Sequence, residues 1–286
     1  MAKGRELKGR IKSVENTRKI TRTLEMVATS KMKRAQDRVT ATRPYATVLS
    51  EVISSLYSAD LAERFPLLRQ PATVRRAAML VLTANRGLAG SFNSNILKEA
   101  RGLLTRLTSE NVDVELHVVG RKGVGYLRYI GRALATARTD IGDRPTVGEA
   151  AELVDGLMDR FASGALDAVY VVSARFKSAL STPPHTERIL PVTPPERKGV
   201  ARDYLLLPSA EAILTELLPL YVRNAVYRAL VENEAGFQGA QRTAMKNATD
   251  NATDMLNLLK RNYNRARQAN ITQEISEIVG GSAALE

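Results

Sequence analysis

Two long stretches of the chain, one near each end, carry apolar residues at helical spacing and lack the residues that break helices. From Arg10 to Arg43 there is no Gly or Pro, and most residues are good helix formers. Alternate steps of three and four residues define a heptad-like seam. Its members are Leu7, Ile11, Val14, Arg18, Thr21, Glu25, Ala28, Met32, Ala35 and Val39. We predict one long helix, with a seam that three polar residues interrupt.

The apolar pattern of this first helix extends in two further ways. Ile20, Leu24 and Val27 form a second stripe, which predicts that the apolar face broadens or drifts around the helix. Beyond Pro44 the same spacing resumes, through Ala46, Leu49, Ile53 and Leu56. Because the pattern continues, we expect Pro44 to bend the helix rather than to end it.

The C-terminal stretch mirrors the first one, because Ala240 to Val279 again lacks Gly and Pro. The same 3–4 spacing is kept by Met245, Ala248, Ala252, Met255, Leu259, Asn262, Ala266 and Ala269. Roughly 40 helical residues span about 60 Å, which is longer than a compact domain of this size needs. Two such helices favour an intramolecular antiparallel coiled coil. Its seams hold few large aliphatic residues, so we expect a thin pair, open to solvent or enclosed by a partner.

The middle of the chain changes its period. Three strand-like runs, Ala77–Thr83, Val112–Gly120 and Leu166–Phe176, are separated by helical patterns through Ile96 to Leu107 and over Val147–Phe161. Strands that alternate with helices predict a Rossmann-like α/β domain with a mostly parallel sheet. The Pro-rich segment 181–199 predicts an excursion at the sheet edge and a linker.

The expected fold class is therefore α/β, a central α/β domain combined with a long antiparallel coiled coil. We expect an N-terminal coiled-coil helix in residues 1–60, a central domain with its connecting segments in 61–207, and a C-terminal coiled-coil helix in 208–286. Residues 1–60 and 208–286 form one discontinuous unit in this prediction.

Charge is concentrated in the first helix. The net charge is +12, and residues 1–43 hold 13 Lys and Arg against 4 acidic residues. This raises nucleic acid, acidic lipid or an acidic protein surface as partners. The chain has no Cys and two His, which excludes disulfides and His-rich metal sites. It has no signal-like N-terminus and no apolar stretch long enough to span a membrane, so we expect a protein that does not cross one.

The glycine-rich segments do not match a nucleotide-binding motif. The loop after the first strand, "ANRGLAGSFN", and the segment "GRKGVG" at Gly120–Gly125 lack both the phosphate-loop and the dinucleotide spacing. We expect these glycines to serve tight turns and close helix–sheet packing. His117 lies in an apolar strand and His185 beside two prolines, with no nucleophile and base pattern around either. The sequence predicts no catalytic residue, cofactor or metal.

The basic helix leaves three interpretations open. It can neutralise phosphates non-specifically, although aromatic residues are few and no nucleic-acid module is present. It can be a solvated face without a partner. It can also be a protein-binding surface, on which Lys31, Lys33 and Arg34 meet acidic side chains of another subunit.

Three motifs identify a family. The segment "KSVENTRKITRTLEMVATSKMKRAQ", the loop "RGLAGSFN" and the ending "ARQANITQEISEIVGG" together resemble the gamma subunits of F-type ATP synthases. The resemblance covers essentially the whole chain in the right order. Ser282 stands where Ala is usual, and Ala89-Gly90 stands where the family often has Cys-Gly.

The resemblance implies a rotor subunit that is not itself an enzyme. The terminal helices would form the axle inside a ring of three alpha and three beta subunits, and the α/β domain would contact the epsilon subunit and the membrane c-ring. Proton flow would turn the rotor on the cytoplasmic face of the cell membrane, and nucleotide would bind only to partner subunits. The resemblance implies no nucleic-acid partner.

The resemblance also implies partner contacts. Lys31, Lys33 and Arg34 become candidates to face an acidic loop on the beta subunits. Polar contacts near the top of the axle would be made by Arg242, Gln268, Thr272 and Glu274. The alternative is a basic coiled-coil nucleic-acid-binding protein, and an α/β enzyme has no support beyond the glycine loop.

Overall fold

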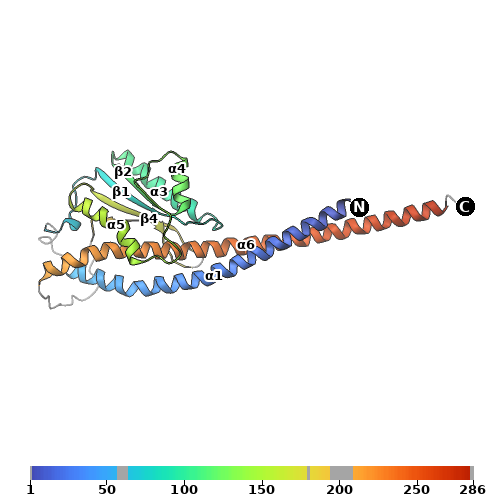
Figure 1. Ribbon diagram of the computed structural model, residues 1–286, viewed down its shortest axis with the longest axis horizontal. Helices are drawn as coiled ribbons and strands as arrows, with labels where there is room; N and C mark the ends of the chain where they lie inside the picture. Colours follow the sequence, from blue (N-terminus) through green and yellow to red (C-terminus); the bar gives the residue numbers. More distant parts are fainter. Residues whose placement is uncertain (1, 57–63, 179–180, 194–208, 284–286) are drawn as a thin grey trace. The chain divides into compact units, whose positions relative to one another are not determined.

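The computed structural model describes residues 2–56, 64–178, 181–193 and 209–283 (Figure 1). The chain divides into two compact units. Unit 1 is Met1–Ala28 with Gln241–Glu286, and unit 2 is Thr29–Ala240. Both units contain parts of the two long helices, α1 at Ala2–Leu56 and α6 at Ala210–Ala283. The domain boundaries expected near residues 60 and 207 lie outside the described residues, so that division stays a prediction.

Unit 2 is built on a five-stranded sheet with the order β3-β2-β1-β4-β5. The strands are β1 Arg76–Leu82, β2 Asp113–Val119, β3 Thr136–Arg138, β4 Ala168–Ala174 and β5 Pro184–Leu190. The first four are parallel to their neighbours, and β5 pairs with β4 in the antiparallel sense. The predicted mostly parallel sheet is confirmed, and the expected excursion at the edge is the strand β5.

Helices cover both faces of the sheet (Figure 1). On one face lie α3, Phe92–Ser109, and α4, Arg121–Tyr129. The other face carries α5, Val147–Ala162, together with the unit 2 parts of α1 and α6. A short 3-10 helix, Pro66–Leu68, precedes β1. The result is a three-layer α/β domain, in which α1 and α6 belong to one of the layers.

The continuous apolar run of β1 follows from its central position. Met79 and Val81 point into the core beneath α3 and α4, while Leu80 and Leu82 point into the core beneath α5 and α6. All four side chains are fully buried. A parallel strand that is covered on both faces consists of an unbroken run of apolar residues, because neither face needs polar residues toward solvent.

Two elements of the α/β domain were not expected from the sequence. The helix α4 contains Gly123 and Gly125, which are poor helix formers. The strand β3 is only three residues long, too short to show a periodic pattern. The helix α5 was expected, and a capping box between Thr146 and Glu149 fixes its start.

Close packing of α4 against β1 explains two of the glycines in "GRKGVG". Gly120 has a φ of +98°, and a Cβ on it would lie 2.2 Å from the carbonyl oxygen of Thr83. A Cβ on Gly123 would lie 2.7 Å from the Thr83 hydroxyl. The expectation of close helix–sheet packing is confirmed at both positions.

The long helix α6 is an integral part of the core of unit 2. A stripe at steps of four residues is buried against the sheet and α5: Leu214, Leu218, Val222, Val226 and Leu230. In the same core α1 contributes Leu49, Ile53 and Leu56. These three residues continue the seam beyond Pro44, and α1 runs through Pro44 without ending, as predicted.

Unit 1 is a pair of antiparallel helices, as the fold class predicted. The start of α1 and the end of α6 lie at the same end of the pair, and α6 continues past the start of α1 (Figure 1). Every unit 1 member of the predicted α1 seam is buried or half-buried: Leu7, Ile11, Val14, Arg18, Thr21, Glu25 and Ala28. The three polar residues Arg18, Thr21 and Glu25 thus lie in the contact between the two helices.

The second stripe on α1 does not broaden the buried face as expected. Ile20 is 60% exposed and Val27 is 47% exposed, and only Leu24 is half-buried. A pair of helices covers only a narrow strip of each partner, so residues beside an a/d seam remain at the surface.

The seam predicted for α6 is wrong at three positions, Met255, Asn262 and Ala269, which are exposed, whereas the predicted Ala248 is half-buried. Its buried and half-buried face runs through Met245, Thr249, Ala252, Leu256, Leu259, Tyr263, Ala266 and Asn270. Leu256 is 2% exposed, whereas the predicted Met255 is 53% exposed. The two registers share every second member. The observed one buries Leu256 and Tyr263, which removes more apolar area from water than Met255 and Asn262 would.

The packing of α4 predicts opposite effects for two substitutions in the same helix. Gly123→Ala should lower the free energy of unfolding by about 2 kcal/mol or more, because the new methyl group overlaps the Thr83 side chain. Gly125→Ala meets no atom within 4 Å and should leave stability unchanged or raise it by about 0.5–1 kcal/mol. Urea denaturation of the two variants measures both values, and equal effects would contradict the packing described.

Candidate functional site

The crevice at the carboxyl ends of β1 and β4 is occupied by the chain itself. In open parallel sheets, ligands commonly bind at the carboxyl ends of two neighbouring strands whose following connections run in opposite directions along the sheet. Here Asn233 of α6 reaches the end of β4, and its Oδ1 accepts a hydrogen bond of 3.1 Å from the amide of Ala174. Phe237 packs edge-on against Phe92 at the start of α3, with ring centroids 5.8 Å apart. The helix α6 therefore closes the crevice.

Polar contacts tie α6 to three other elements of unit 2. Arg223 forms a two-pronged ion pair with Asp155 of α5, at 2.7 and 2.8 Å. Arg228 binds Glu187 of β5 at 3.1 Å. Glu232 accepts a hydrogen bond of 3.2 Å from the amide of Phe176, just beyond β4. Bidentate arginine pairs add geometric specificity to packing, so these contacts fix the rotation of α6 on the domain.

The N-terminus of α4 is likewise used within the chain. A helix N-terminus that binds phosphate needs amides pointing at the ligand. The amide of Arg121 donates to Oδ1 of Asn85 at 3.0 Å, and that of Lys122 donates to the carbonyl of Ala84 at 3.2 Å. The amide of Gly123 donates to the Thr83 hydroxyl at 2.9 Å. These three amides of the first turn hold the loop after β1.

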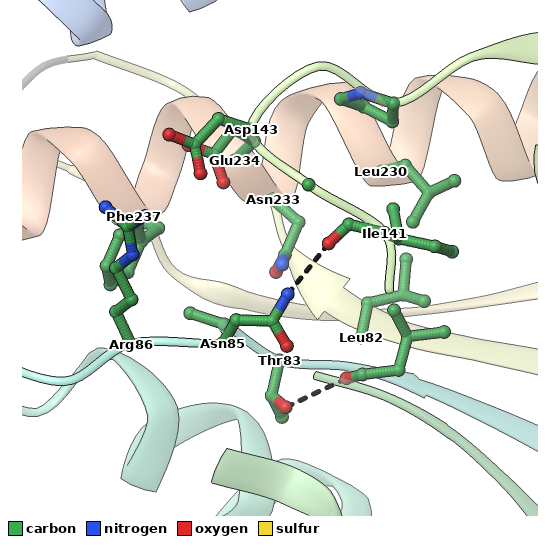
Figure 2. A pocket seen from close by; sticks show the side chains of 14 residues that line it. Leu82, Thr83, Asn85, Arg86, Ile141, Asp143, Leu230, Asn233, Glu234 and Phe237 are labelled. Atoms are coloured by element: carbon green, nitrogen blue, oxygen red, sulfur yellow. Dashed lines mark hydrogen bonds between the residues drawn. The ribbon is translucent and has the colours of Figure 1, made fainter. Parts of the chain in front are cut away.

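A small cavity remains between this loop and α6 (Figure 2). Its volume is about 40 Å³, room for roughly three water molecules. Sites that hold drug-sized ligands or cofactors measure about 300–1,000 Å³. The polar side chains around it are Thr83, Asn85, Arg86, Asp143, Asn233 and Glu234. The cavity is too small for a nucleotide.

Charged residues from three elements gather at one side of this cavity. Lys31 of α1 forms an ion pair with Asp143, which lies in the loop between β3 and α5. Arg38, two turns further along α1, donates to the backbone carbonyl of Asp143 at 3.2 Å. Glu234 of α6 lines the cavity beside Asp143 and accepts a hydrogen bond of 2.6 Å from Gln238. We call Lys31, Arg38, Asp143 and Glu234 the junction cluster.

The acidity of Glu234 is perturbed within this cluster. Burial raises the pKa of its carboxyl group to about 7, and the negative charge of Asp143 acts in the same direction. The hydrogen bond from Gln238 and the positive charges of Lys31 and Arg38 lower the pKa, but by less. Glu234 therefore changes its charge near neutral pH.

His117 has a structural role in β2. Its Nδ1 is hydrogen-bonded to the Thr136 hydroxyl of β3 at 2.9 Å, and its side chain is buried. Burial lowers the pKa of His117, with nearby Arg160 contributing and Glu115 opposing. The imidazole is thus neutral at physiological pH and joins two strands, as a core residue was expected to do.

The helix pair of unit 1 combines a polar seam with an exposed apolar end. The Thr249 hydroxyl donates to that of Thr21 across the pair at 2.8 Å. Beyond the start of α1, the last part of α6 is exposed along its whole circumference. Four large apolar side chains stand there, which we call the apolar tip: Ile271, Ile275, Ile278 and Val279. Ile278 alone is 71% exposed, and large exposed apolar patches are typical of interaction sites.

The seven residues predicted to contact partners lie in different environments. Lys31 is part of the junction cluster, and exposed Lys33 forms an i,i+4 pair with Asp37 at 3.2 Å. Of the predicted contact residues on α6, Gln268, Thr272 and Glu274 are exposed. Arg34 is exposed on α1. Arg242 is half-buried, and its Nε has no hydrogen-bond partner among the described residues. None of these positions tests the proposed contacts, which stay predictions.

Sequence reasoning missed Asp143 and Glu234. Asp143 lies in a loop without periodic pattern, and Glu234 looks like one more polar residue on a long helix. Only the fold brings them together with Lys31, which is more than 100 positions from either. The signal available in the sequence was weak: Glu234 follows the buried stripe that ends at Leu230 by one helical turn.

In the part of the chain that the structure describes, no helix is long and apolar enough to cross a membrane. Among the same residues, no group of three or more His, Cys, Asp or Glu side chains could hold a metal ion.

The fold defines a class: a protein with an antiparallel helix pair and an α/β domain whose crevice is filled by a helix of the same chain. A family model described as ATP synthase matches residues 3–285. The chain is 66% identical to the ATP synthase gamma chain of Gemmatimonas aurantiaca and 43% identical to that of Leptospira biflexa, over the full length of both proteins in each case. It belongs to the ATP synthase gamma-chain family.

Solved structures agree with this fold. The central stalk of the Tetrahymena thermophila mitochondrial ATP synthase is 25% identical, with a TM-score of 0.63 over 80% of this chain and 99% of that one. The rotor of the Euglena gracilis mitochondrial ATP synthase has a TM-score of 0.68 at 19% identity, over 94% of this chain and 99% of that one. The nucleic-acid-binding alternative is not favoured by any of these relatives.

The environments of Lys31 and Lys33 predict different effects on stability. Lys31→Met should lower the free energy of unfolding by about 1 kcal/mol, because it leaves the half-buried Asp143 without its cation. Lys33→Met removes an exposed pair and should change stability by less than about 0.5 kcal/mol. Guanidinium denaturation of the isolated chain compares the two, and a larger loss for Lys33→Met would contradict the junction cluster.

Proposed function

We propose that this chain is the central rotor of a proton-translocating F-type ATP synthase, which transmits rotation between the membrane c-ring and the alpha/beta catalytic ring. The observation that carries the proposal is the family match along residues 3–285, with identity of 66% to a gamma chain over the full length of both. The expected division into a helical shaft, residues 1–60 with 208–286, and a domain in 61–207 belongs to this proposal.

The helix pair of unit 1 suits a shaft within a ring of alpha and beta subunits. A thin pair leaves side chains exposed on all sides, and the apolar tip offers a surface for a surrounding sleeve of protein. Lys33 and Arg34 of α1 are exposed in unit 2 and are proposed to approach an acidic loop on beta, Lys33 by leaving its exposed pair with Asp37. Arg242, Gln268, Thr272 and Glu274 are proposed to contact the ring along α6.

Lys31 has a modified role in this proposal. Its ammonium group is engaged by Asp143 of the same chain, so it can meet a beta subunit only by sharing or leaving that pair. We therefore assign the contact with beta first to Lys33 and Arg34. Exposed ion pairs contribute only about 0–1 kcal/mol each. Weak contacts suit a rotor, because each must pass from one subunit to the next.

The α/β domain is proposed to contact the epsilon subunit and the c-ring, at the cytoplasmic face of the cell membrane and peripheral to it. The rotor itself is proposed to bind no nucleotide and to catalyse no reaction. The closed crevice and the small cavity support this view, since neither offers space for a nucleotide. Coupling would arise because the asymmetric rotor makes different contacts with each beta subunit and so favours a different conformation in each.

The rotor proposal can be tested through a single cysteine, because the chain has none of its own. The Arg34→Cys variant is labelled with a photoreactive maleimide and assembled with cysteine-free alpha and beta subunits. Irradiation should join it to beta, and ATP hydrolysis should fall in proportion to the cross-linked fraction, since a fixed rotor cannot turn.

The matched control is Ser109→Cys at the exposed end of α3, which carries the same label. Its irradiation should leave ATP hydrolysis unchanged in this complex. An undiminished rate of ATP hydrolysis in a completely cross-linked Arg34→Cys complex would overturn the rotor proposal. The absence of any cross-link would show that Arg34 does not contact beta.

A further inference from the structure

The junction cluster lies where three chain segments meet within unit 2. Lys31 and Arg38 come from α1, Asp143 comes from the β3–α5 loop, and Glu234 comes from α6. The two basic residues hold the loop by different atoms, since Lys31 binds the Asp143 carboxylate and Arg38 binds its backbone carbonyl. Both contacts hold the Asp143 part of this loop against α1.

Other contacts hold the parts of the loop that lie away from Asp143, among them a two-pronged ion pair between Asp140 and Arg138 at 2.6 and 2.8 Å. Its exposed residues include Gly142 and Arg144, and only Ile141 and Pro145 are buried. Asn85 donates a hydrogen bond of 2.8 Å to the carbonyl of Ile141, which anchors one end of the loop to the segment after β1 (Figure 2). The part around Asp143 is held by Lys31 and Arg38. A change in the charge of a neighbouring group will therefore alter these two contacts.

Two carboxylates compete for the same cations in this cluster. When Glu234 is protonated, Asp143 is the only anion of the cluster, and both cations hold the loop. When Glu234 is ionised, it repels Asp143 and attracts Lys31 and Arg38. The remaining charged group on the cavity wall is Arg86, from the loop after β1, and the neutral Gln238 is hydrogen-bonded to Glu234.

We propose that Glu234 is a proton-operated latch: its protonated form lets Lys31 and Arg38 clamp the loop 139–146 onto α1, and its ionised form loosens that clamp. The latch acts within one chain and does not depend on the proposed rotor function. It would make the attachment of the α/β domain to α1 tighter in acid and looser in alkali.

The pH window follows from the acidity of Glu234. Its pKa is raised from the ordinary 4.5 to about 7 by burial. A carboxyl group with a raised pKa binds its proton more tightly in the folded state, so its contribution favours the folded, clamped state at low pH. This contribution declines as the pH rises above 4.5 and is lost once the pH exceeds 7. At pH 6 roughly nine tenths of Glu234 is protonated, and at pH 8 roughly nine tenths is ionised.

Hydrogen exchange of the full chain tests the latch directly. Amide exchange in residues 139–146 is measured at pH 6 and pH 8 and corrected for the intrinsic effect of pH on exchange. Protection of this loop should fall by about fivefold or more between pH 6 and pH 8 in the unaltered protein. In Glu234→Gln, which cannot ionise, protection at pH 8 should stay at the value found at pH 6.

Two further variants complete the test. Glu216→Gln removes an exposed carboxylate of α6 in the same unit and should keep the pH dependence of the unaltered chain. Lys31→Met should leave the loop weakly protected at both pH values. Equal corrected protection at pH 6 and pH 8 in the unaltered chain would overturn the proposal, whether or not any variant folds. An undiminished pH dependence in Glu234→Gln would overturn the role of Glu234.

Discussion

Burial of α6 within the α/β domain is the constraint on which the rest of unit 2 depends. Its apolar stripe from Leu214 to Leu230 completes the core on one face of the sheet, and Asn233 and Phe237 close the crevice at the carboxyl ends of the strands. Arg223 and Arg228 then fix the rotation of the helix. Because α6 is a layer of the domain, the domain cannot be removed from it without exposing the core to water.

The same constraint accounts for the kind of function the fold supports. A sheet of this topology commonly binds a ligand at its crevice, but here a helix of the same chain takes that place. The domain is thereby attached to α6 through side chains that belong to its own core. This is the attachment that the proposed role in transmitting rotation needs. The Lys31–Asp143 pair adds a second tie, to α1, whose strength we relate to the proton on Glu234.

Much of this could be predicted from local patterns, and the failures have physical causes. The strands β1, β2 and β4 and the seam of α1 follow from apolar periodicity, which a short element such as β3 cannot display. For α6 the pattern admitted two registers, and only packing against α1 could choose Leu256 over Met255. The junction cluster was invisible, because Asp143 and Glu234 meet only after the sheet has placed a loop beside a helix. Family motifs gave the functional hypothesis, which periodicity alone left open.

Native-state hydrogen exchange in increasing denaturant tests the central claim, that α6 is part of the α/β domain. If α6 is a layer of the core, amides from Val222 to Val231 should exchange with the same free energy and denaturant dependence as those of β1 and β4, through one shared unfolding event. If these α6 amides instead exchange through a separate opening of clearly lower free energy, while β1 and β4 stay protected, the helix is not an integral layer and the account is contradicted.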